Sequence, residues 1–255
     1  MFKYSVLSSG SKGNSVYIES GSARILLDAG ISLRDMESRL AILGREAASL
    51  DAIFLTHEHS DHVRGVGPIA RSSGATVYST QGTLRGIEKK AGKLPEWRGF
   101  RAGEPLTVGD LIIEPYETPH DARETVAFTV HCDGKKIGHA TDMGKLTPTT
   151  VGALRHSDVL LVEANHDVEM LMAGPYSWPL KRRIRSEEGH LSNEVCGELI
   201  SQVVHSQLKM TVLMHLSETN NCPEIAQMTA RQALGSHATP MILARQDQPT
   251  PLMEV

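Results

Sequence analysis

Cysteine is scarce in this sequence and poorly placed to form a structural framework. The 255 residues include only three cysteines, at positions 132, 196 and 222. They lie far apart, and none belongs to a C-x-x-C pair. This spacing argues against a zinc finger and against a disulfide scaffold. Reduced thiols and a cytoplasmic location are the simplest interpretation.

Long apolar runs, linkers and repeats are also missing. No segment approaches the roughly 18 consecutive apolar residues of a membrane helix, so no membrane contact is predicted. The chain has 255 residues, 40% hydrophobic composition and a formal net charge of -4, which fits a single domain over residues 1–255. This mild acidity neither indicates nor excludes an anionic substrate, because bound metal adds positive charge locally. Nothing in the pattern indicates a protein partner.

What the sequence does contain is a dense cluster of metal-binding residue types. The segment Thr56–His62 holds three histidines and two carboxylates, and it follows the apolar run Ala52–Leu55. A strand ending there would deliver several ligands to one point. His57 and His59 are two residues apart, so extended backbone aims both rings the same way. The adjacent pair Asp61–His62 suits a turn that faces a second ion, so two metal ions are predicted.

Three further candidate ligands follow other expected strands. His120, Asp142 and His215 come after strands expected at 111–116, 136–140 and 210–214. A ligand at the end of a strand is fixed by the sheet but opens onto a loop. The predicted metal centre therefore has seven ligands: His57, His59, Asp61, His62, His120, Asp142 and His215.

The alternation of strands and amphipathic helices indicates a layered α/β fold. Strands are expected at 2–7, 15–20, 24–28, 52–55, 76–78, 106–108, 111–116, 126–131, 136–140, 158–162, 210–214 and 240–243. Helices are expected at 63–71 and after the cap or first-turn residues Ser32, Thr147, Ser192 and Pro223. Two β-rich halves, each with covering helices, predict a four-layer αβ/βα sandwich of two sheets.

These motifs together resemble those of metallo-β-lactamase-fold hydrolases, and more narrowly those of the YycJ (WalJ-type) subgroup. The matching segments span most of the chain: 8–15, 27–30, 56–62, 165–167, 189–193 and 215–218. The H-x-H-x-D-H pattern at 57–62 is specific to the superfamily. The other segments narrow the resemblance to its nuclease-like members.

The resemblance also implies how the ligands divide between two divalent ions. Each ion receives three ligands, and one carboxylate bridges them: His57, His59 and His120 for the first ion, Asp61, His62 and His215 for the second, and Asp142 between them. Such nitrogen and oxygen donors suit zinc, manganese or iron, so the ligands do not name the metal. The two ions would share a hydroxide that attacks phosphorus in line with the leaving oxygen.

A proton for the leaving group is expected from His190. In the similar ribonuclease Z-type enzymes, a histidine in a G-H-S/T setting works with an upstream glutamate, and His190 and Glu163 match those positions. Glu163 is expected to orient His190 as the general acid, and Asp61 is assigned to catalysis as well as to metal binding. Alternatively, His190 only packs at the start of the helix after Ser192. The resemblance gives Asp28 a supporting role beneath the histidine loop.

The glycine- and serine-rich loop at 8–15 is a candidate for phosphate contact. Its backbone N–H groups and the side chains of Ser9, Ser11 and Asn14 could bind an anion, as glycine-rich nests do. The loop lacks the G-x-x-x-x-G-K-S/T order of a nucleotide-binding loop. A tight turn packed beside the metal centre explains it nearly as well.

A basic run is the second candidate for substrate contact. Lys181 and Arg182 open a run that continues with Arg183 and Arg185, and this run could contact a nucleic-acid backbone. The alternative is an ordinary solvated face. His166 is expected near the rim of the site, where it contacts substrate or braces a loop.

The favoured function is a dinuclear metal-dependent phosphodiesterase, in particular a DNA exonuclease, as the subgroup implies. Only 48 positions separate Asp142 from His190, and 25 separate His190 from His215. This leaves no room for the large inserted domain of some RNA-processing relatives. Two alternatives remain open: a hydrolase of a small phosphodiester, ester or thioester, and a non-catalytic regulatory protein with the same fold.

Overall fold

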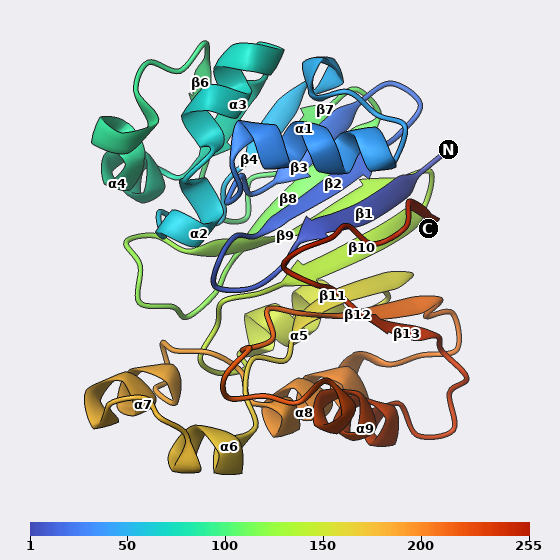
Figure 1. Cartoon of the computed structure of the whole chain (residues 1–255). Coiled ribbons are helices and arrows are strands. Elements are labelled where there is room, and N and C mark those ends of the chain that lie inside the picture. Colours follow the sequence, from blue (N-terminus) through green and yellow to red (C-terminus); the bar gives the residue numbers. More distant parts are fainter.

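The computed structural model describes residues 1–255 and contains two seven-stranded mixed sheets that pack face to face (Figure 1). The first sheet has the order β14-β1-β2-β3-β4-β5-β6, with Lys3–Ser8 (β1), Ser15–Glu19 (β2), Arg24–Leu27 (β3), Ala52–Phe54 (β4), Thr76–Ser79 (β5), Trp97–Gly99 (β6) and Met253–Glu254 (β14). The second has the order β13-β12-β11-β10-β9-β8-β7, with Leu106–Val108 (β7), Leu111–Glu117 (β8), Val126–Cys132 (β9), Lys135–Ala140 (β10), Val159–Glu163 (β11), Met210–Met214 (β12) and Met241–Leu243 (β13).

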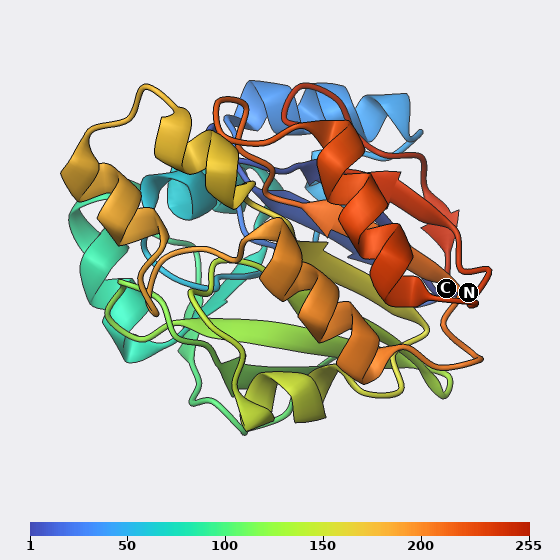
Figure 2. The ribbon, with the colours of Figure 1, turned by 90° about the horizontal axis from the view of Figure 1, so that it is seen from below.

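Helices cover the outer face of each sheet, so the molecule has four layers (Figures 1 and 2). The first sheet is covered by Leu33–Ile42 (α1), Val66–Ser73 (α3) and Gln81–Ala91 (α4), with the short helix Ser60–Val63 (α2) and the 3-10 turn Ala47–Ser49 (η1) beside them. The second is covered by Pro148–Leu154 (α5), Asn193–Val203 (α8) and Pro223–Leu234 (α9). Val168–Ala173 (α6) and Trp178–Ile184 (α7) project from one end. The predicted αβ/βα sandwich is confirmed.

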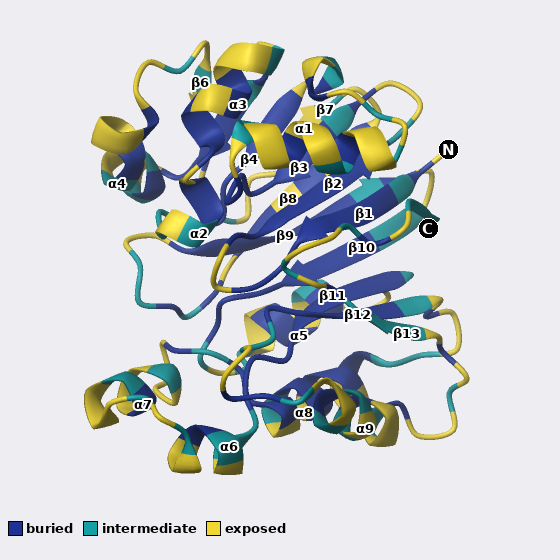
Figure 3. Cartoon of the chain, viewed as in Figure 1, coloured by how far each residue is buried: buried dark blue, intermediate teal, exposed yellow.

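Three apolar clusters hold these layers together, and the central strands are largely buried (Figure 3). The central cluster lies between the sheets, where Phe54 and Phe128 meet edge to face with ring centroids 5.8 Å apart. The second cluster joins the outer face of the first sheet to α1, α3 and α4, and the third joins the second sheet to α5, α8 and α9. Burial on both faces explains why central strands such as β4 and β11 are almost continuously apolar, whereas β8 alternates buried and exposed residues.

Local sequence signals fix most helix boundaries. The predicted caps are observed, since Ser32, Thr147 and Ser192 each accept a hydrogen bond from a backbone N–H in the first turn. The helix expected at 63–71 is instead two helices, α2 and α3. Gly65 lies between them, and a Cβ at this position would lie 1.9 Å from the carbonyl oxygen of Ile31, so no larger residue fits there.

The cysteines form no disulfide. All three are free, and Cys132 and Cys196 are buried in the apolar clusters, where they act as small apolar side chains. None of the helices has both the length and the apolar character needed to cross a membrane.

Candidate metal centre

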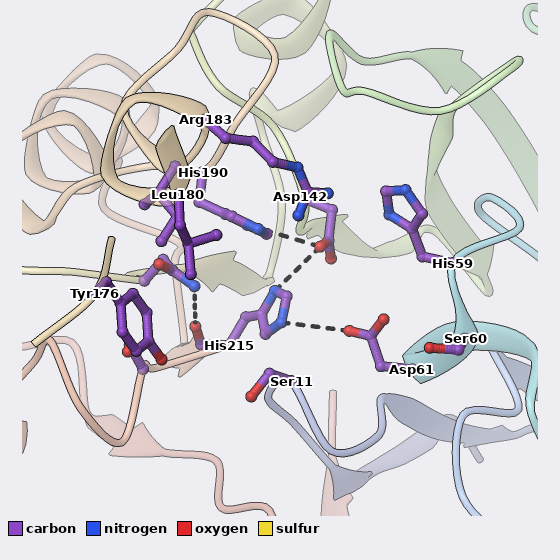
Figure 4. A pocket seen from close by; sticks show the side chains of 13 residues that line it. Ser11, His59, Ser60, Asp61, Asp142, Tyr176, Leu180, Arg183, His190 and His215 are labelled. Carbon is purple, nitrogen blue, oxygen red and sulfur yellow. Dashed lines mark hydrogen bonds and ion pairs between the residues drawn. The ribbon is translucent and has the colours of Figure 1, made fainter. Parts of the chain in front are cut away.

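The candidate ligands follow strand ends, and four of them, His59, Asp61, Asp142 and His215, line one cavity (Figure 4). β4 ends at Phe54, and the chain then has no regular secondary structure until α2 begins at Ser60. Three residues of the site, Asp28, Asp142 and His215, have φ between 54° and 62°. This left-handed conformation is uncommon outside glycine and is concentrated at functional sites.

His57, His59 and His120 form the first group of ligands. Nε2 of His57 lies 3.0 Å from Nδ1 of His59, and Nε2 of His120 lies 3.2 Å from the same atom. One ring nitrogen from each of the three lies within 4.8 Å of those of the other two. Three imidazoles that aim nitrogens at one point have the arrangement of a metal site rather than of a packed core.

The second group contains Asp61, His62 and His215. Oδ2 of Asp61 lies 3.5 Å from Nε2 of His62 and 3.7 Å from Nε2 of His215. Asp142 stands between the two groups, since its carboxylate oxygens lie 3.2 Å from His62, 3.2 Å from His215 and 3.8 Å from His120. The structure therefore brings all seven predicted ligands to one place and puts the predicted bridging carboxylate in the middle.

Two buried polar atoms show that this arrangement suits a cation. Oδ2 of Asp142 and Nδ1 of His215 are buried and make no hydrogen bond. Their ionisable neighbours at 3.2 Å lack hydrogen-bond geometry. A buried polar atom without a partner is costly, and coordination to a metal ion satisfies it. The donor set of imidazole nitrogens and carboxylate oxygens fits zinc, manganese or iron equally.

Two of the imidazoles are held in the neutral form that binds metal. Burial lowers the pKa of His57 well below its usual value, and the charge on His62 lowers it further. Burial also lowers the pKa of His120, against the opposing effect of Asp142. A neutral ring presents a free lone pair, which is what coordination requires.

Around Asp142, neighbouring carboxylates change the pKa values of the histidines more than burial does. Burial alone would lower the pKa of His62, but Asp142 and Asp28 raise it well above its usual value. Asp142 likewise raises the pKa of His215 to about 10. Burial would raise the pKa of Asp142 itself, but His215 and His62 hold it well below its usual range. These carboxylates are stabilised by positive charge at the nitrogens of His62 and His215. Either protons or divalent ions bound there can supply this charge.

Asp28 braces the histidine loop from below. Its Oδ2 lies 2.7 Å from Nδ1 of His62, and the backbone and hydroxyl of Thr56 both donate to the carboxylate at 2.9 Å. The expected supporting position is therefore observed. This contact fixes the His62 ring with Nε2 toward the metal centre, as carboxylates do for metal-binding histidines.

Replacing Asp28 by asparagine is expected to weaken metal binding by about 10- to 100-fold, because the buried ring of His62 loses its charged acceptor. Asparagine keeps the shape of the side chain and tolerates the left-handed backbone. Competition with a chromogenic chelator measures the affinity, and Asp247→Asn, in a surface ion pair with Arg245, is the control. Equal affinities of the two variants would contradict the supporting role.

Glu163 and His190 form a hydrogen-bonded pair beside the ligands. Nδ1 of His190 lies 2.6 Å from Oε1 of Glu163. Burial would raise the pKa of Glu163, but His190 holds it at about 2, so the carboxylate is ionised. His190 therefore uses Nδ1 to contact Glu163, which leaves Nε2 for a proton transfer. The ring lines the same cavity as the ligands.

The same pair is also close enough to be part of the metal centre. Ionisable atoms of Asp142, Glu163, His190 and His215 lie within 4.8 Å of one another. Nδ1 of His190 is 3.7 Å from Asp142, much farther than the 2.6 Å to Glu163. The short contact favours a carboxylate–histidine pair over direct coordination by His190, and metal content after removal of His190 distinguishes the two roles.

A cavity of about 370 Å³ opens over these groups. Four of its lining residues come from the metal centre: His59, Asp61, Asp142 and His215. Other parts of its wall come from Ser11, Asn165, Ser217 and the α7 region, including Tyr176, Leu180 and Arg183 (Figure 4). The metal centre therefore faces a polar, solvent-accessible opening that one short segment closes on one side.

The glycine-serine loop lies against the ligands, and this corrects part of its predicted role. Oγ of Ser9 accepts a hydrogen bond from the backbone N–H of His215 at 2.7 Å, and Ser9 is buried. The buried side-chain amide of Asn14 contacts Asp61 at 3.2 Å and His62 at 3.0 Å. Both side chains position ligands and are not free for substrate. Ser11 alone is exposed and lines the cavity.

The basic run needs a similar correction. Lys181 is buried, and its Nζ donates to the carbonyl oxygens of Met172 and Gly174 at 2.7 Å each, so it joins α6 to α7 instead of contacting substrate. Arg182 is exposed but lies outside the metal-centre cavity. His166 is buried and does not line that cavity, so rim contact with substrate is not what its position supports.

Asp121 is a site residue that the sequence reasoning missed. Its carboxylate pairs with the guanidinium of Arg183 and lies 3.5 Å from Nε2 of His120 and 3.8 Å from Nε2 of His59. Its place directly after His120 was the available signal. The pair ties the projecting α7 region to the loop that carries a ligand.

Gly30 supports the ligand loop through backbone contact. A Cβ at this position would lie 1.7 Å from the carbonyl oxygen of Asp61 and 2.6 Å from the backbone nitrogen of Asn14. These two backbones are themselves hydrogen bonded at 2.7 Å. Any side chain at Gly30 must therefore displace the segment that carries Asp61 and His62.

Gly30→Ala is expected to lower the free energy of unfolding by roughly 1–3 kcal/mol, as overpacking does, and to weaken metal binding. Gly152→Ala is the matched control, since nothing lies within 4 Å of a Cβ there and the site is inside α5. Denaturant unfolding of both variants makes the comparison. If Gly30→Ala and the parent chain had equal free energies of unfolding, the loop would accommodate the added Cβ without loss of stability.

Comparison with known proteins agrees with this geometry. Residues 23–216 match the family described as the beta-lactamase superfamily domain. The chain is 42% identical to the exodeoxyribonuclease WalJ of Streptococcus pneumoniae serotype 2 over 89% of this chain and 86% of that protein. It is 35% identical to the exodeoxyribonuclease YycJ of Bacillus anthracis over 91% of this chain and 88% of that protein.

A solved structure supports the fold independently of close sequence similarity. The metallo-beta-lactamase fold protein YhfI of Bacillus subtilis superposes with a TM-score of 0.76, covers 98% of both chains and is 18% identical. An identity this low speaks for the fold alone. Taken with the matched residues and the two relatives above, it follows that the chain belongs to the beta-lactamase superfamily domain family, within the group that includes WalJ and YycJ.

Proposed function

We propose that this chain is a dinuclear metal-dependent phosphodiesterase that acts as a DNA exonuclease. The observation that carries the proposal is the joint geometry of the site. Two groups of ligands share Asp142, and the Glu163–His190 pair lies beside them at 2.6 Å. Relatives named exodeoxyribonucleases, at 42% and 35% identity over most of the chain, support the choice of DNA.

Each part of the site has a role in this proposal. His57, His59 and His120 would hold one ion, Asp61, His62 and His215 the other, and Asp142 both. Divalent ions held in this way activate water as a nucleophile and neutralise charge on the phosphate. The protein fixes the ligands through Asp28, Ser9 and Asn14, so that little reorganisation is needed during reaction.

His190 would supply the proton that the leaving oxygen needs. Glu163 accepts the hydrogen bond at Nδ1 and stabilises the charged imidazolium, which leaves Nε2 to donate. Polar side chains, including Ser11 and Ser217, line the solvent-accessible cavity beside the metal centre, so the end of a polymer could reach the ligands from solvent. An open polar cavity of this kind favours a phosphodiester chain over an apolar small substrate.

Digestion of labelled DNA tests the proposal directly. Linear duplex and single-stranded DNA, covalently closed circles and RNA of the same sequence are incubated with protein that was stripped of metal and then loaded with manganese, zinc or iron. We expect linear DNA to be shortened from an end while circles persist. Hydrolysis of bis-p-nitrophenyl phosphate reports on the metal centre independently of the polymer.

The outcomes separate the candidate functions. Cleavage of bis-p-nitrophenyl phosphate without digestion of any DNA would replace the proposal by a small-phosphodiester hydrolase. Cutting of closed circles would replace exonuclease by endonuclease activity, and faster digestion of RNA would change the substrate. No hydrolysis with any of the three metals would leave a non-catalytic protein of the same fold.

A further inference from the structure

The aromatic side chains of this chain are distributed unevenly between its interior and its surface. Among all its tryptophan, tyrosine and phenylalanine residues, only Trp97, Tyr176 and Trp178 are not buried. Trp97 has a structural role, because it packs on the apolar cluster of the first sheet and donates to Ser79 Oγ at 2.9 Å. Tyr176 and Trp178 lie two residues apart, and no hydrogen bond engages the side chain of either one. A half-buried tyrosine and an exposed tryptophan therefore stand close together in one short segment, with no structural hydrogen bond to account for them.

This segment lies beside the catalytic cavity. We call residues 174–185, which include α7, the aromatic arm. Tyr176 lines the metal-centre cavity together with Leu180 and Arg183 (Figure 4). Trp178 is 56% exposed and lines a separate hollow of about 140 Å³ with Met172 and the basic residues of α7. The arm therefore presents one aromatic ring at the cavity and a second ring just outside it.

All charged side chains of the aromatic arm are basic. No aspartate or glutamate occurs between residues 170 and 186, and Arg182, Arg183 and Arg185 are exposed. Arg183 is held by Asp121, whereas Arg182 has no ion-pair partner and Arg185 contacts only the sulfur of Met172, at 3.3 Å. Two guanidinium groups without carboxylate partners thus flank Trp178. Glu187, beyond the arm, is paired with Lys145.

An aromatic ring lining the cavity and an exposed ring among cations match the chemistry of single-stranded nucleic acid. Bases stack on aromatic rings and phosphates pair with arginine, and this combination binds single strands with little sequence preference. Bases inside a duplex already stack on one another, so only unpaired bases have faces free for these rings. A hydrophobic protein partner would fit Trp178 alone but not a ring inside the catalytic cavity.

We propose that the aromatic arm binds the unpaired end of the substrate strand. Tyr176 stacks on the base of the nucleotide that enters the metal centre, Trp178 stacks on a base farther along, and Arg182 and Arg185 contact phosphates. This inference rests on the proposed nuclease function and adds to it the form of the substrate, a single-stranded end. The arm serves binding, and the bond is cleaved at the metal centre.

Binding measured without turnover tests the inference. A ten-residue oligothymidylate is compared with an abasic oligomer of equal length, which keeps the phosphates but lacks bases. Fluorescence anisotropy is measured on the full chain in the presence of a chelator, so that no cleavage occurs. In a Trp97→Phe background, Trp178 is the sole tryptophan, and its emission reports stacking directly.

We expect the parent chain to bind oligothymidylate roughly tenfold or more tightly than the abasic oligomer, and Trp178 emission to be quenched. Tyr176→Ala and Trp178→Ala are each expected to weaken oligothymidylate binding roughly tenfold and to reduce this preference. Tyr176→Phe and Trp178→Phe keep a ring and are expected to retain it. Met228→Ala, on α9, is the control, because Met228 is 57% exposed but lies outside the arm.

Three results would overturn the inference. The first is equal affinity of the parent chain for the two oligomers. The second is quenching by duplex alone. The third is a dimer in sedimentation that Trp178→Ala dissociates, since the arm would then join two copies of the chain. Hydrolysis of bis-p-nitrophenyl phosphate by the metal-loaded parent chain depends on the metal centre and not on the arm. If this hydrolysis is observed while one of the three results above is obtained, the inference about the arm fails and the proposed phosphodiesterase function does not.

Discussion

His190→Ala is expected to reduce kcat on DNA by about 10²–10⁴ while the metal content stays unchanged. A reduction in kcat of this size is typical when one general acid is removed. The reason is geometric, since Nδ1 of His190 is fixed by Glu163 at 2.6 Å and Nε2 remains to serve the leaving oxygen. Glu163→Gln is expected to act in the same direction with a smaller effect, because the amide no longer stabilises the charged ring. Steady-state kinetics and metal analysis on the same samples provide the measurement.

The leaving group supplies a sharper test of this role. A substrate with a good leaving group, such as bis-p-nitrophenyl phosphate, needs little protonation, so its hydrolysis should suffer much less in His190→Ala than that of DNA. His237→Ala, a histidine remote from the site, is the control. Loss of metal from His190→Ala would instead make His190 a ligand in the alternative group with Asp142, Glu163 and His215. An equal loss on both substrates would exclude the acid role.

Most of the fold could be predicted from sequence because its central strands are strongly apolar and several of its helices, such as α1, α5 and α8, begin with a side-chain cap. The strands at 106–108 and 210–214 were predicted to the residue. The elements that were missed carry weak signals. β14 has two residues and forms only because it pairs with β1. α4 has a good cap in Thr80, but glycine at positions 82 and 86 lowers its helix propensity.

Glycine 86 in α4 shows why a propensity argument fails there. A Cβ at Gly86 would lie 2.4 Å from the side chain of Glu58. The glycine therefore allows α4 to approach the histidine loop closely, and tertiary contact outweighs the local preference. Such a contact joins residues far apart in the sequence, so it could not be read from the pattern around Gly86.

The convergence of the ligands could be predicted because each follows a strand, and strand ends share an edge. Which polar side chains remain free to bind substrate could not be predicted. Ser9 and Lys181 are ordinary polar residues in sequence, and only the fold shows that their polar atoms are used by the backbone of His215 and by the carbonyl oxygens of Met172 and Gly174. The same limit applies to Tyr176, whose place at the cavity depends on how α6 and α7 project from the sheets.

Asp142 is the residue on which both halves of the metal centre depend. Its carboxylate lies between His62, His120 and His215, at 3.2, 3.8 and 3.2 Å. One of its oxygens is buried and makes no hydrogen bond. In the proposed two-ion arrangement, a change at this position would affect both ions at once, whereas loss of any single histidine would affect one.

Asp142→Asn is expected to bring hydrolysis to background and to weaken binding of both ions, because the bridging charge is lost. Asparagine keeps the size and the left-handed backbone, so the effect is electrostatic. In the parent chain, free metal at about 100 times its Kd should stabilise the fold by about 2.7 kcal/mol, which thermal unfolding detects, and the variant should lose this gain. Asp133→Asn, with φ of 50° in an exposed turn, is the matched control. If Asp142→Asn kept two ions per chain and its metal-dependent stabilisation, the bridge would lie elsewhere and the assignment of ligands to two coupled sites would be wrong.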